Sequence, residues 1–549
     1  MHGWASGSNP CRTPPVTTDE NDSEQTKQAA QGTARAVGRG GLAVLGAKVY
    51  FVLLGFVQQI ALKQAIGMAG YGALSRVLAP ANIINNVIVS SSTQGVSRAV
   101  AAGGSHREEA FRATLRVHAP LAIGLALLFA LLSPAYAAFQ GSPHIVTPLR
   151  ILACVVAIYG IYAPLVGSLN GRAMFTRQAA LDTIFATLRT AGLIGVGLLF
   201  KRYFDLGVEG SVTGFVLATL IIFPMALAWS GTGRSTDAAI ARAPEIPRPS
   251  AYLAQLLPLA LAQLFANGLM QADIAVLGRF VSSGAIQSGL AGVAAAESAD
   301  EWVGVYRFCQ LFAFLPYQLV LSVAQILFPM VARAHAENDR DSVRRYVQRG
   351  ARISTLACGL AVAVIVVLPG SVLGIAGGRV VAERGAATLR ILVLGQGAFT
   401  LFSIGATVLA SLGKERLSAG LSFVLLLLLT SAVWIASSGA VYGEAQLRAT
   451  ALSTSLTLGV GLLIMAFAVQ RYASTFIPIG TFVRAAAGVA LAYLAGLALP
   501  RFGWMITPFV GLGVGLAYVI FLGLTGELKA ADRAMVLSLL SRRSRSTPK

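Results

Sequence analysis

Residues 419–437 read AGLSFVLLLLLTSAVWIAS and contain no charged side chain. A helix needs about 20 apolar residues to cross the roughly 30 Å hydrocarbon layer of a bilayer. Similar stretches recur on both sides of this one, and their length and continuity favour membrane-spanning helices over a β-barrel. We predict fourteen spans, at about 42–67, 71–100, 116–139, 145–169, 179–200, 207–229, 251–280, 302–331, 353–376, 387–412, 419–437, 446–469, 481–500 and 507–524.

The composition agrees with a membrane protein. Of the 549 residues, 55% are hydrophobic and 12% are charged, which excludes a soluble globular protein. We therefore predict an all-α membrane fold between two polar ends. Residues 1–40 are predicted to be a disordered cytoplasmic tail, and residues 526–549 a basic cytoplasmic tail.

The basic residues predict the orientation of the chain. Of the 43 Lys and Arg residues, 29 lie in the two tails and in alternate loops, and eight lie in the opposite loops. Since Lys and Arg gather on the cytoplasmic side, both termini are expected in the cytoplasm. The same rule, together with anionic lipid headgroups, accounts for the net charge of +20, so no nucleic-acid partner is expected.

An internal repeat divides the spans. Residues 97–101 (SRAVA) recur as 332–336 (ARAHA), and the Leu-Arg-Ile-Leu sequence of 149–152 recurs at 389–392. Six spans separate the matched points, and because this number is even the two copies are parallel. The sequence therefore predicts two six-helix lobes and a C-terminal helix pair, at residues 41–230, 251–470 and 481–525.

Polar side chains concentrate in the first two spans of each repeat, where Asn82, Asn86, Gln271 and Gln310 are examples. An unpaired amide in hydrocarbon is costly, so these faces should border protein or water. A central cavity between the lobes, walled by these four spans, satisfies both the repeat and the polarity. Alternatively, the amides only hydrogen-bond between packed helices.

Six bases lie inside the apolar stretches: Lys48, Lys63, Arg76, Arg189, Arg279 and Arg307. A charge in lipid is costly and usually faces a polar interior, so all six are candidate ligands of an anion. Arginine suits phosphate through its planar fork of donors. Arg76, Arg189 and Arg307 are the leading candidates, whereas Lys63 and Arg279 lie near span ends, where extension to the headgroups is favoured.

Asp273 is one of two acids that offset these bases. A structural ion pair is its favoured role, and the alternative is that it carries a coupling proton or sodium ion. No phosphate-binding loop, histidine cluster or long external segment occurs, so we expect no enzyme, no cofactor and no metal site.

Several of these segments resemble one family, the multidrug/oligosaccharidyl-lipid/polysaccharide (MOP) flippase superfamily. They are AQILFPMVAR at 324–333 with Asn338-Asp339 after it, residues 273–278 followed by Gly304-Val305-Tyr306, and SLNGR at 168–172. The resemblance implies two six-helix lobes around a cavity that opens alternately to each face.

Within the superfamily, the fourteen spans look more like those of the polysaccharide and lipid II flippases. In that branch the extra helix pair forms a groove for the lipid tail, and bases of the first, second and eighth helices bind substrate phosphates. Lys48, Arg76 and Arg307 occupy these helices here. The chain departs from the branch in that Arg307 is about one turn displaced and the first helix carries lysines.

The predicted function is that of a flippase for an undecaprenyl-pyrophosphate-linked glycan, multi-pass in the bacterial inner membrane. The glycan would be an O-antigen or exopolysaccharide unit or lipid II, and membrane lipids, a glycan polymerase or glycosyltransferases are the expected partners. One alternative is a multidrug antiporter for organic cations, which predicts an acidic cavity. The other is a membrane scaffold or a subunit of a glycan polymerase.

Overall fold

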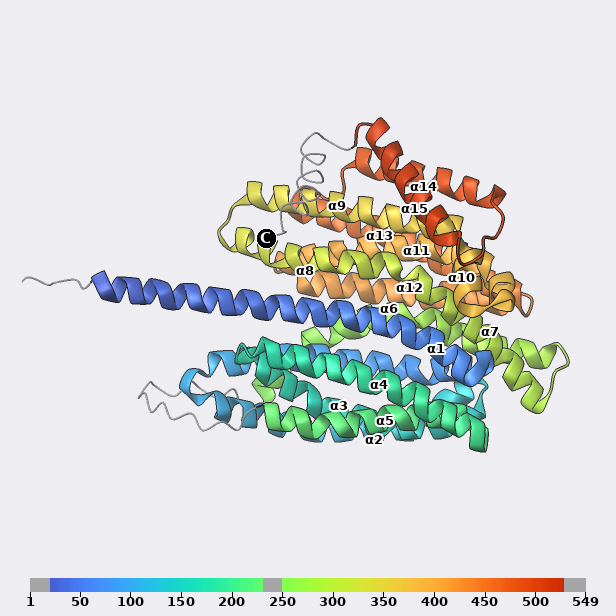
Figure 1. Cartoon of the computed structure of the whole chain (residues 1–549), viewed down its shortest axis with the longest axis horizontal. Coiled ribbons are helices and arrows are strands. Elements are labelled where there is room, and N and C mark those ends of the chain that lie inside the picture. The colour runs from blue at the N-terminus through green and yellow to red at the C-terminus, as the bar shows by residue number, and fades with distance from the viewer. Residues whose placement is uncertain (1–19, 231–248, 528–549) are drawn as a thin grey trace, which may run out of the picture.

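The computed structural model describes residues 20–230 and 249–527, in which every regular element is a helix (Figure 1). The long helices of the first half are α1 (Glu20–Ala102), α2 (Arg107–Gln140), α3 (Val146–Gly171), α4 (Phe175–Phe204) and α5 (Gly207–Trp229). The second half contains α6 (Pro249–Gln287), α7 (Gly292–Ala313), α8 (Leu315–Ala336), α9 (Arg340–Val367), α10 (Pro369–Gly377), α11 (Arg379–Ser411), α12 (Glu415–Gly439) and α13 (Glu444–Ala473). The helices α14 (Ile479–Ala498) and α15 (Thr507–Leu524) follow, and two short 3-10 turns flank α2.

The predicted number of spans agrees with this structure. Among the described residues, 13 helices are long and apolar enough to cross a membrane. The first of them, Tyr50–Ala102, has 53 residues and breaks at Gly67, whose φ of 78° lies in a region that only glycine adopts without strain. It therefore forms two spans, and the fold is the predicted all-α membrane fold.

Two lobes with the same packing pattern form the bundle. In the first lobe α3 packs against α2 and α5, and α4 packs against α5. In the second lobe α11 packs against α9 and α13, and α12 packs against α13. Figure 1 shows α2–α5 on one side and α8–α13 on the other, with α1 and α6 between them. The pattern matches the parallel repeat inferred from sequence.

Three predicted boundaries are wrong. The helix α1 begins at Glu20, so residues 20–40 are helical and not disordered; residues 1–19 lie outside the described part. The single span predicted at 302–331 is two helices, because Pro316 cannot continue α7 and starts α8. The segment between the spans predicted at 302–331 and 353–376 is largely helical, and Asp339 caps α9 by accepting a hydrogen bond from the Ser342 N–H at 2.9 Å.

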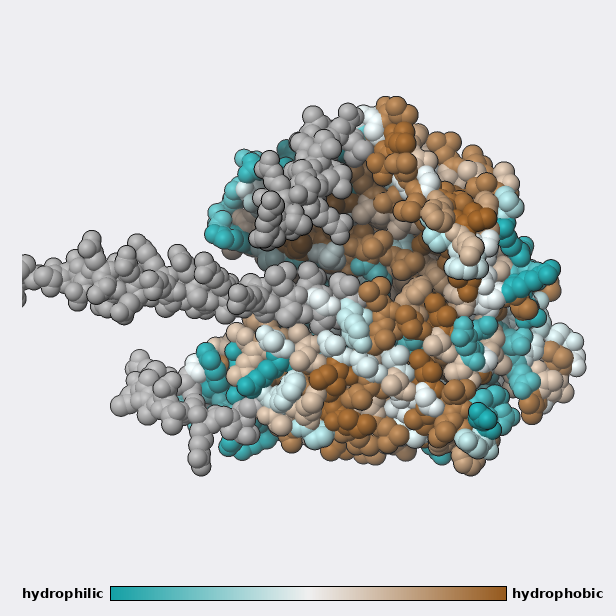
Figure 2. Space-filling model, viewed as in Figure 1, coloured by the Kyte–Doolittle hydropathy of each residue, from teal (hydrophilic) through white to brown (hydrophobic). Residues whose placement is uncertain are grey.

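The bundle has two ends, which we name by their turns. The tail end carries the turns at 103–106, 337–339 and 412–414, and the far end carries those at 141–145, 288–291 and 440–443. Figure 2 shows an apolar surface between the two ends and polar residues gathered at each of them. This distribution is that of a multi-pass membrane protein. The cytoplasmic location of the tail end stays a prediction from the charges.

Candidate functional site

The lobes meet along the helices that the sequence analysis selected as polar. The second segment of α1 packs against α6 and α7, and these pairs join the first lobe to the second. The first helices of each repeat thus form the boundary between the lobes, as predicted. The side chains on this boundary form the candidate site.

A buried ion pair joins the lobes at the far end. Nε of Arg76, on α1, lies 3.0 Å from Oδ1 of Asp300, on α7. Only 1% of Arg76 and 4% of Asp300 is exposed. Nη1 of Arg76 also donates to Oγ of Ser142 at 2.5 Å and to Oγ of Ser282 at 2.8 Å. Oδ2 of Asp300 lies 2.8 Å from Nε2 of His144. We call these five residues the far-end seal.

The backbones beside the far-end seal are in direct contact. A Cβ added to Gly72 would lie 1.8 Å from the carbonyl oxygen of Asp300, and one added to Gly304 would lie 2.6 Å from that of Met68. No side chain can occupy these positions without separating the helices. The glycines therefore allow α1 and α7 to close the far end of the boundary.

Two further candidate bases link the lobes through carbonyl groups. Nζ of Lys63 donates to the carbonyl oxygen of Gly377 in α10 at 2.7 Å. Nη1 of Arg279 donates to the carbonyl oxygen of Phe139 at 3.1 Å, and its guanidinium lies over the rings of Phe139 and Trp434. Both side chains are thus held at the lobe boundary, whereas the sequence favoured extension to the headgroups. Phosphate binding by these bases and by Arg76 stays a prediction.

Arg189 lies inside the first lobe, away from the far-end seal. Its Nε is 3.5 Å from Oε1 of Gln58, which also accepts a hydrogen bond from Thr190 at 2.9 Å. The guanidinium lies 5.4 Å from the ring centre of Phe51 and 5.6 Å from that of Phe215. Aromatic faces stabilise a cation at these distances, so Arg189 is held among α1, α4 and α5.

Asp273 belongs to a polar cluster between α6 and α7. Its carboxylate accepts hydrogen bonds from Oη of Tyr306 at 2.7 Å and from Nε2 of Gln310 at 2.9 Å. Nη1 of Arg307 donates to Oε1 of Gln310 at 3.0 Å and lies 3.5 Å from Oε1 of Gln271. Among the described residues, no base lies within ion-pair distance of Asp273. Neutral donors thus replace the ion pair that the sequence favoured, and a coupling role stays a prediction.

The remaining candidates lie on α1. Nδ2 of Asn86 donates to Oδ1 of Asn267 on α6 at 2.8 Å, and this amide pair is exposed midway along both helices. Asn82 is half-buried one turn earlier on α1. Lys48 lies in α1, but its side chain is outside the described part of the chain. The exposed amide pair therefore joins the lobes at a depth where the space between them is open.

The lobes separate towards the tail end. Figure 2 shows the coloured surface hollowed there into a recess between the two lobes. On α8, Gln318, Ser322 and Gln325 are exposed on one helical face. Since glutamine in contact with lipid is costly, this face is expected to border the recess. One flank remains joined, where Nε2 of His118 lies 2.9 Å from Oη of Tyr252. The structure is thus closed at the far end and parted at the tail end.

Sequence reasoning missed the partners of the bases. None of the four residues that contact Arg76 or its partner was selected from the sequence: Asp300, His144, Ser142 and Ser282. A rule that searches for acids at the same membrane depth as Arg76 would have found Asp300. The two serines carry no such signal, because serine is common throughout the spans.

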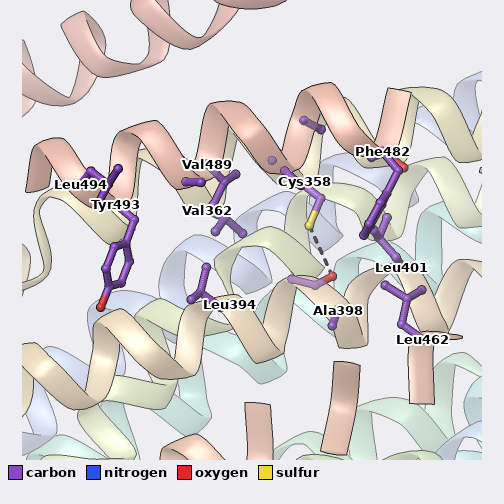
Figure 3. Close-up of a pocket in the computed structure, with 16 residues that line it drawn as sticks. Cys358, Val362, Leu394, Ala398, Leu401, Leu462, Phe482, Val489, Tyr493 and Leu494 are labelled. Carbon is purple, nitrogen blue, oxygen red and sulfur yellow. Dashed lines mark hydrogen bonds between the residues drawn. The ribbon is translucent and has the colours of Figure 1, made fainter. Parts of the chain in front are cut away.

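An apolar groove runs along the outside of the second lobe, between α9, α11, α13 and α14. Its cavity has a volume of about 590 Å³. Figure 3 shows Phe482 at one end and Tyr493 and Leu494 at the other, with Cys358 directed at a backbone carbonyl. The groove therefore uses α14, one of the two helices outside the repeat.

The comparisons with known proteins give the fold. No family model and no curated protein match the chain. The solved structure of the lipid II flippase MurJ, in an inward closed conformation, matches with a TM-score of 0.67 and 13% identity, over 88% of this chain and 98% of that one. An inward-facing multidrug resistance MATE family transporter of the MOP superfamily matches with a TM-score of 0.59 and 15% identity, over 79% of this chain and 99% of that one.

A third match is the Vibrio cholerae MATE transporter VcmN, with a TM-score of 0.53 and 16% identity over 81% of this chain and 98% of that one. The chain thus shares the two-lobed helical fold of these solved structures. This is the fold that the resemblance around residues 324–333 implied.

Proposed function

We propose that the chain is a flippase that moves a polyprenyl-pyrophosphate-linked oligosaccharide across the bacterial inner membrane. The headgroup enters the recess between the lobes, while the prenyl tail stays in the lipid. The far-end seal then opens as the tail end closes, so that the headgroup is released on the other side. This cycle is alternating access by two lobes that move relative to each other.

The environment of Arg307 carries this proposal. Its guanidinium is half-buried at the lobe boundary, and its hydrogen-bond partners are amide oxygens of Gln310 and Gln271. In the described part of the chain no carboxylate lies within ion-pair distance of Arg307. The guanidinium is therefore held by neutral amides, with the carboxylate of Asp273 one side chain away beyond Gln310, and it has no direct ion pair among these residues, which suits a group that receives a phosphate.

The charges also favour an anionic cargo over an organic cation. The two acids at the lobe boundary, Asp273 and Asp300, are buried and already hold hydrogen-bond or ion-pair partners. A multidrug antiporter of organic cations would require an accessible acid in this place. The fold does not separate the two functions, since flippases and multidrug transporters share it.

The test is translocation of a labelled lipid-linked oligosaccharide in cells lacking the endogenous flippase. A charge-assisted hydrogen bond contributes about 1.5–3 kcal/mol, so Arg307→Gln should reduce translocation by about tenfold or more. Arg307→Lys should retain part of it. The matched control is Arg384→Gln, because Arg384 forms a half-exposed ion pair with Glu301 at the far end. Normal translocation in the three variants Arg76→Gln, Arg189→Gln and Arg307→Gln would refute phosphate binding by these bases.

A further inference from the structure

A second cavity lies beyond Tyr493, next to the apolar groove. This cavity, of about 280 Å³, is nearer the far end and is lined by residues of α9, α10, α11, α13 and α14 and by residues 499–501. On α11 the lining passes from Leu394 to Arg390, one turn away, and on α14 it passes from Leu494 to Gly496. The two cavities share no lining residue and adjoin where Arg390 bridges α9 and α14; we describe them together as the apolar part and the polar part of one groove, the polar part being nearer the far end.

The second part is polar and has a positive balance of charge. Five charged residues line it: Arg390, Arg448, Arg501, Glu383 and Glu444. Arg448 pairs with Glu444 at 2.5 Å, one turn away on the same helix. Glu383 pairs with Arg379 at 2.8 Å and lies 3.7 Å from Arg501, so Arg501 is the more loosely held. Three guanidinium groups thus face two carboxylates.

Arg390 lies where the apolar and polar parts meet. Its Nε donates to the carbonyl oxygen of Val366 at 3.1 Å, and its Nη2 donates to that of Gly496 at 2.9 Å. The guanidinium is 5.9 Å from the ring centre of Tyr493. Within the described residues no carboxylate pairs with Arg390. The protein thus holds an unneutralised cation, fixed by α9 and α14, at the end of a hydrocarbon-lined groove.

We propose that this groove binds an anionic phospholipid of the bilayer, with its phosphate at Arg390 and Arg501 and an acyl chain in the apolar part. The apolar part is open to the surrounding lipid, because 39% of Phe482 and 61% of Leu494 is exposed. A phosphate gains charge-assisted hydrogen bonds from arginine, and a headgroup without a positive charge suits the positive balance.

The position of Arg390 distinguishes this lipid from the proposed cargo. The polar part lies at the far end, so the bound phosphate belongs to the leaflet at that end. The cargo begins with its phosphates at the tail end, between the lobes. The groove and the lobe boundary are on different faces of the second lobe, so the two sites can be occupied independently, and this proposal does not require the proposed function.

The test is native mass spectrometry of the purified full-length protein with added phosphatidylglycerol. Phosphatidylcholine with the same acyl chains, undecaprenyl phosphate and inorganic phosphate are added in parallel. We expect one retained phosphatidylglycerol, bound at least tenfold more tightly than phosphatidylcholine. Arg390→Gln and Arg501→Gln should each weaken its binding at least fivefold. Arg501 is included because Arg390 also joins helices, and its replacement alone could disturb the fold.

Two further variants distinguish binding of the phospholipid headgroup from binding of its acyl chain. Ala490→Trp fills the apolar part and should also release the lipid, whereas Arg384→Gln, at the far end but outside the groove, should leave binding unchanged. Equal retention by the wild type and Arg501→Gln would overturn the proposal. Preference for undecaprenyl phosphate would overturn it in favour of the cargo lipid, and displacement by inorganic phosphate would overturn it in favour of a simple anion site.

Discussion

Replacing Asp300 with Asn should open the far end. Asp300 and Arg76 lie on different lobes, and both are almost fully buried in the closed state. The substitution leaves the guanidinium of Arg76 buried without its counter-charge. In an open far end the same guanidinium would be hydrated. The cost of the substitution therefore falls on the closed state.

The free-energy cost of Asp300→Asn to the closed state follows from the burial of the Arg76–Asp300 ion pair. Removing one partner of a buried ion pair costs about 3–5 kcal/mol. Because Asn still offers an oxygen to Arg76, and Ser142 and Ser282 still accept hydrogen bonds from it, we take about 3 kcal/mol as the expected cost. At about 1.4 kcal/mol per factor of ten, the ratio of closed to open molecules should fall about 100-fold.

The assay is a distance measurement between spin labels at Leu206 and Ile286 by double electron–electron resonance. Both side chains are exposed at the far end, one on each lobe. The native cysteines are replaced first. Glu301→Gln is the matched control, since Glu301 is the next residue and forms a half-exposed ion pair with Arg384 inside the second lobe. Such pairs contribute about 0.2–1 kcal/mol, so little change is expected.

Two results test whether the Arg76–Asp300 pair holds the far end closed. Asp300→Asn should add a longer distance that is absent in Glu301→Gln, and the double variant Arg76→Gln/Asp300→Asn should recover part of the closed population, because no uncompensated charge remains. The same distance distribution in Asp300→Asn and Glu301→Gln would refute the far-end seal. A thermal unfolding measurement on each variant shows whether the fold is retained.

Two further predictions concern packing and pH. Gly72→Ala should also open the far end, because its Cβ would meet the Asp300 carbonyl at 1.8 Å; Gly55→Ala, with no atoms within 4 Å of the new Cβ, is the control and should leave the label distances unchanged. Burial raises the pKa of Glu527, but hydrogen bonds from Arg352, Thr481 and Arg484 outweigh this and lower it. A lowered carboxyl pKa stabilises the folded state above the ordinary value of about 4 and ceases to do so as the pH falls through the native pKa. Thermal unfolding of the wild type and Glu527→Gln should therefore differ at neutral pH and converge as the pH falls through the native pKa of Glu527, and an equal difference at neutral and acidic pH would contradict this assignment.

The fold could be predicted because its main signals are local. Apolar length predicts the spans, and the repeated segments predict two similar lobes without any contact information. The incorrect predictions of helix boundaries are also confined to single segments of the chain. Pro316 was known to be a helix breaker, but whether it bends a span or divides it depends on packing around Phe314. Residues 20–40 form a helix although they are polar, since helix and disorder differ there by little free energy.

The candidate site could be predicted only in part. The bases at the lobe boundary were found because charge is rare in apolar stretches, and this signal needs no partner. The ion-pair and hydrogen-bond partners of these bases could not be predicted, because residues such as Arg76 and Asp300 are far apart in sequence and meet only when the lobes pack. Lys63 and Arg279 show the same limit, since a carbonyl oxygen that accepts a hydrogen bond leaves no trace in the sequence.

The charged seal between the lobes has a consequence for the proposed transport cycle. While the pair is intact the closed far end is favoured, so an empty molecule is seldom open there. Leakage of protons and small solutes through unoccupied copies is correspondingly small. In that cycle the cargo must offset the loss of this pair by its own binding, so an anion that binds too weakly to separate Arg76 from Asp300 would not be released at the far end.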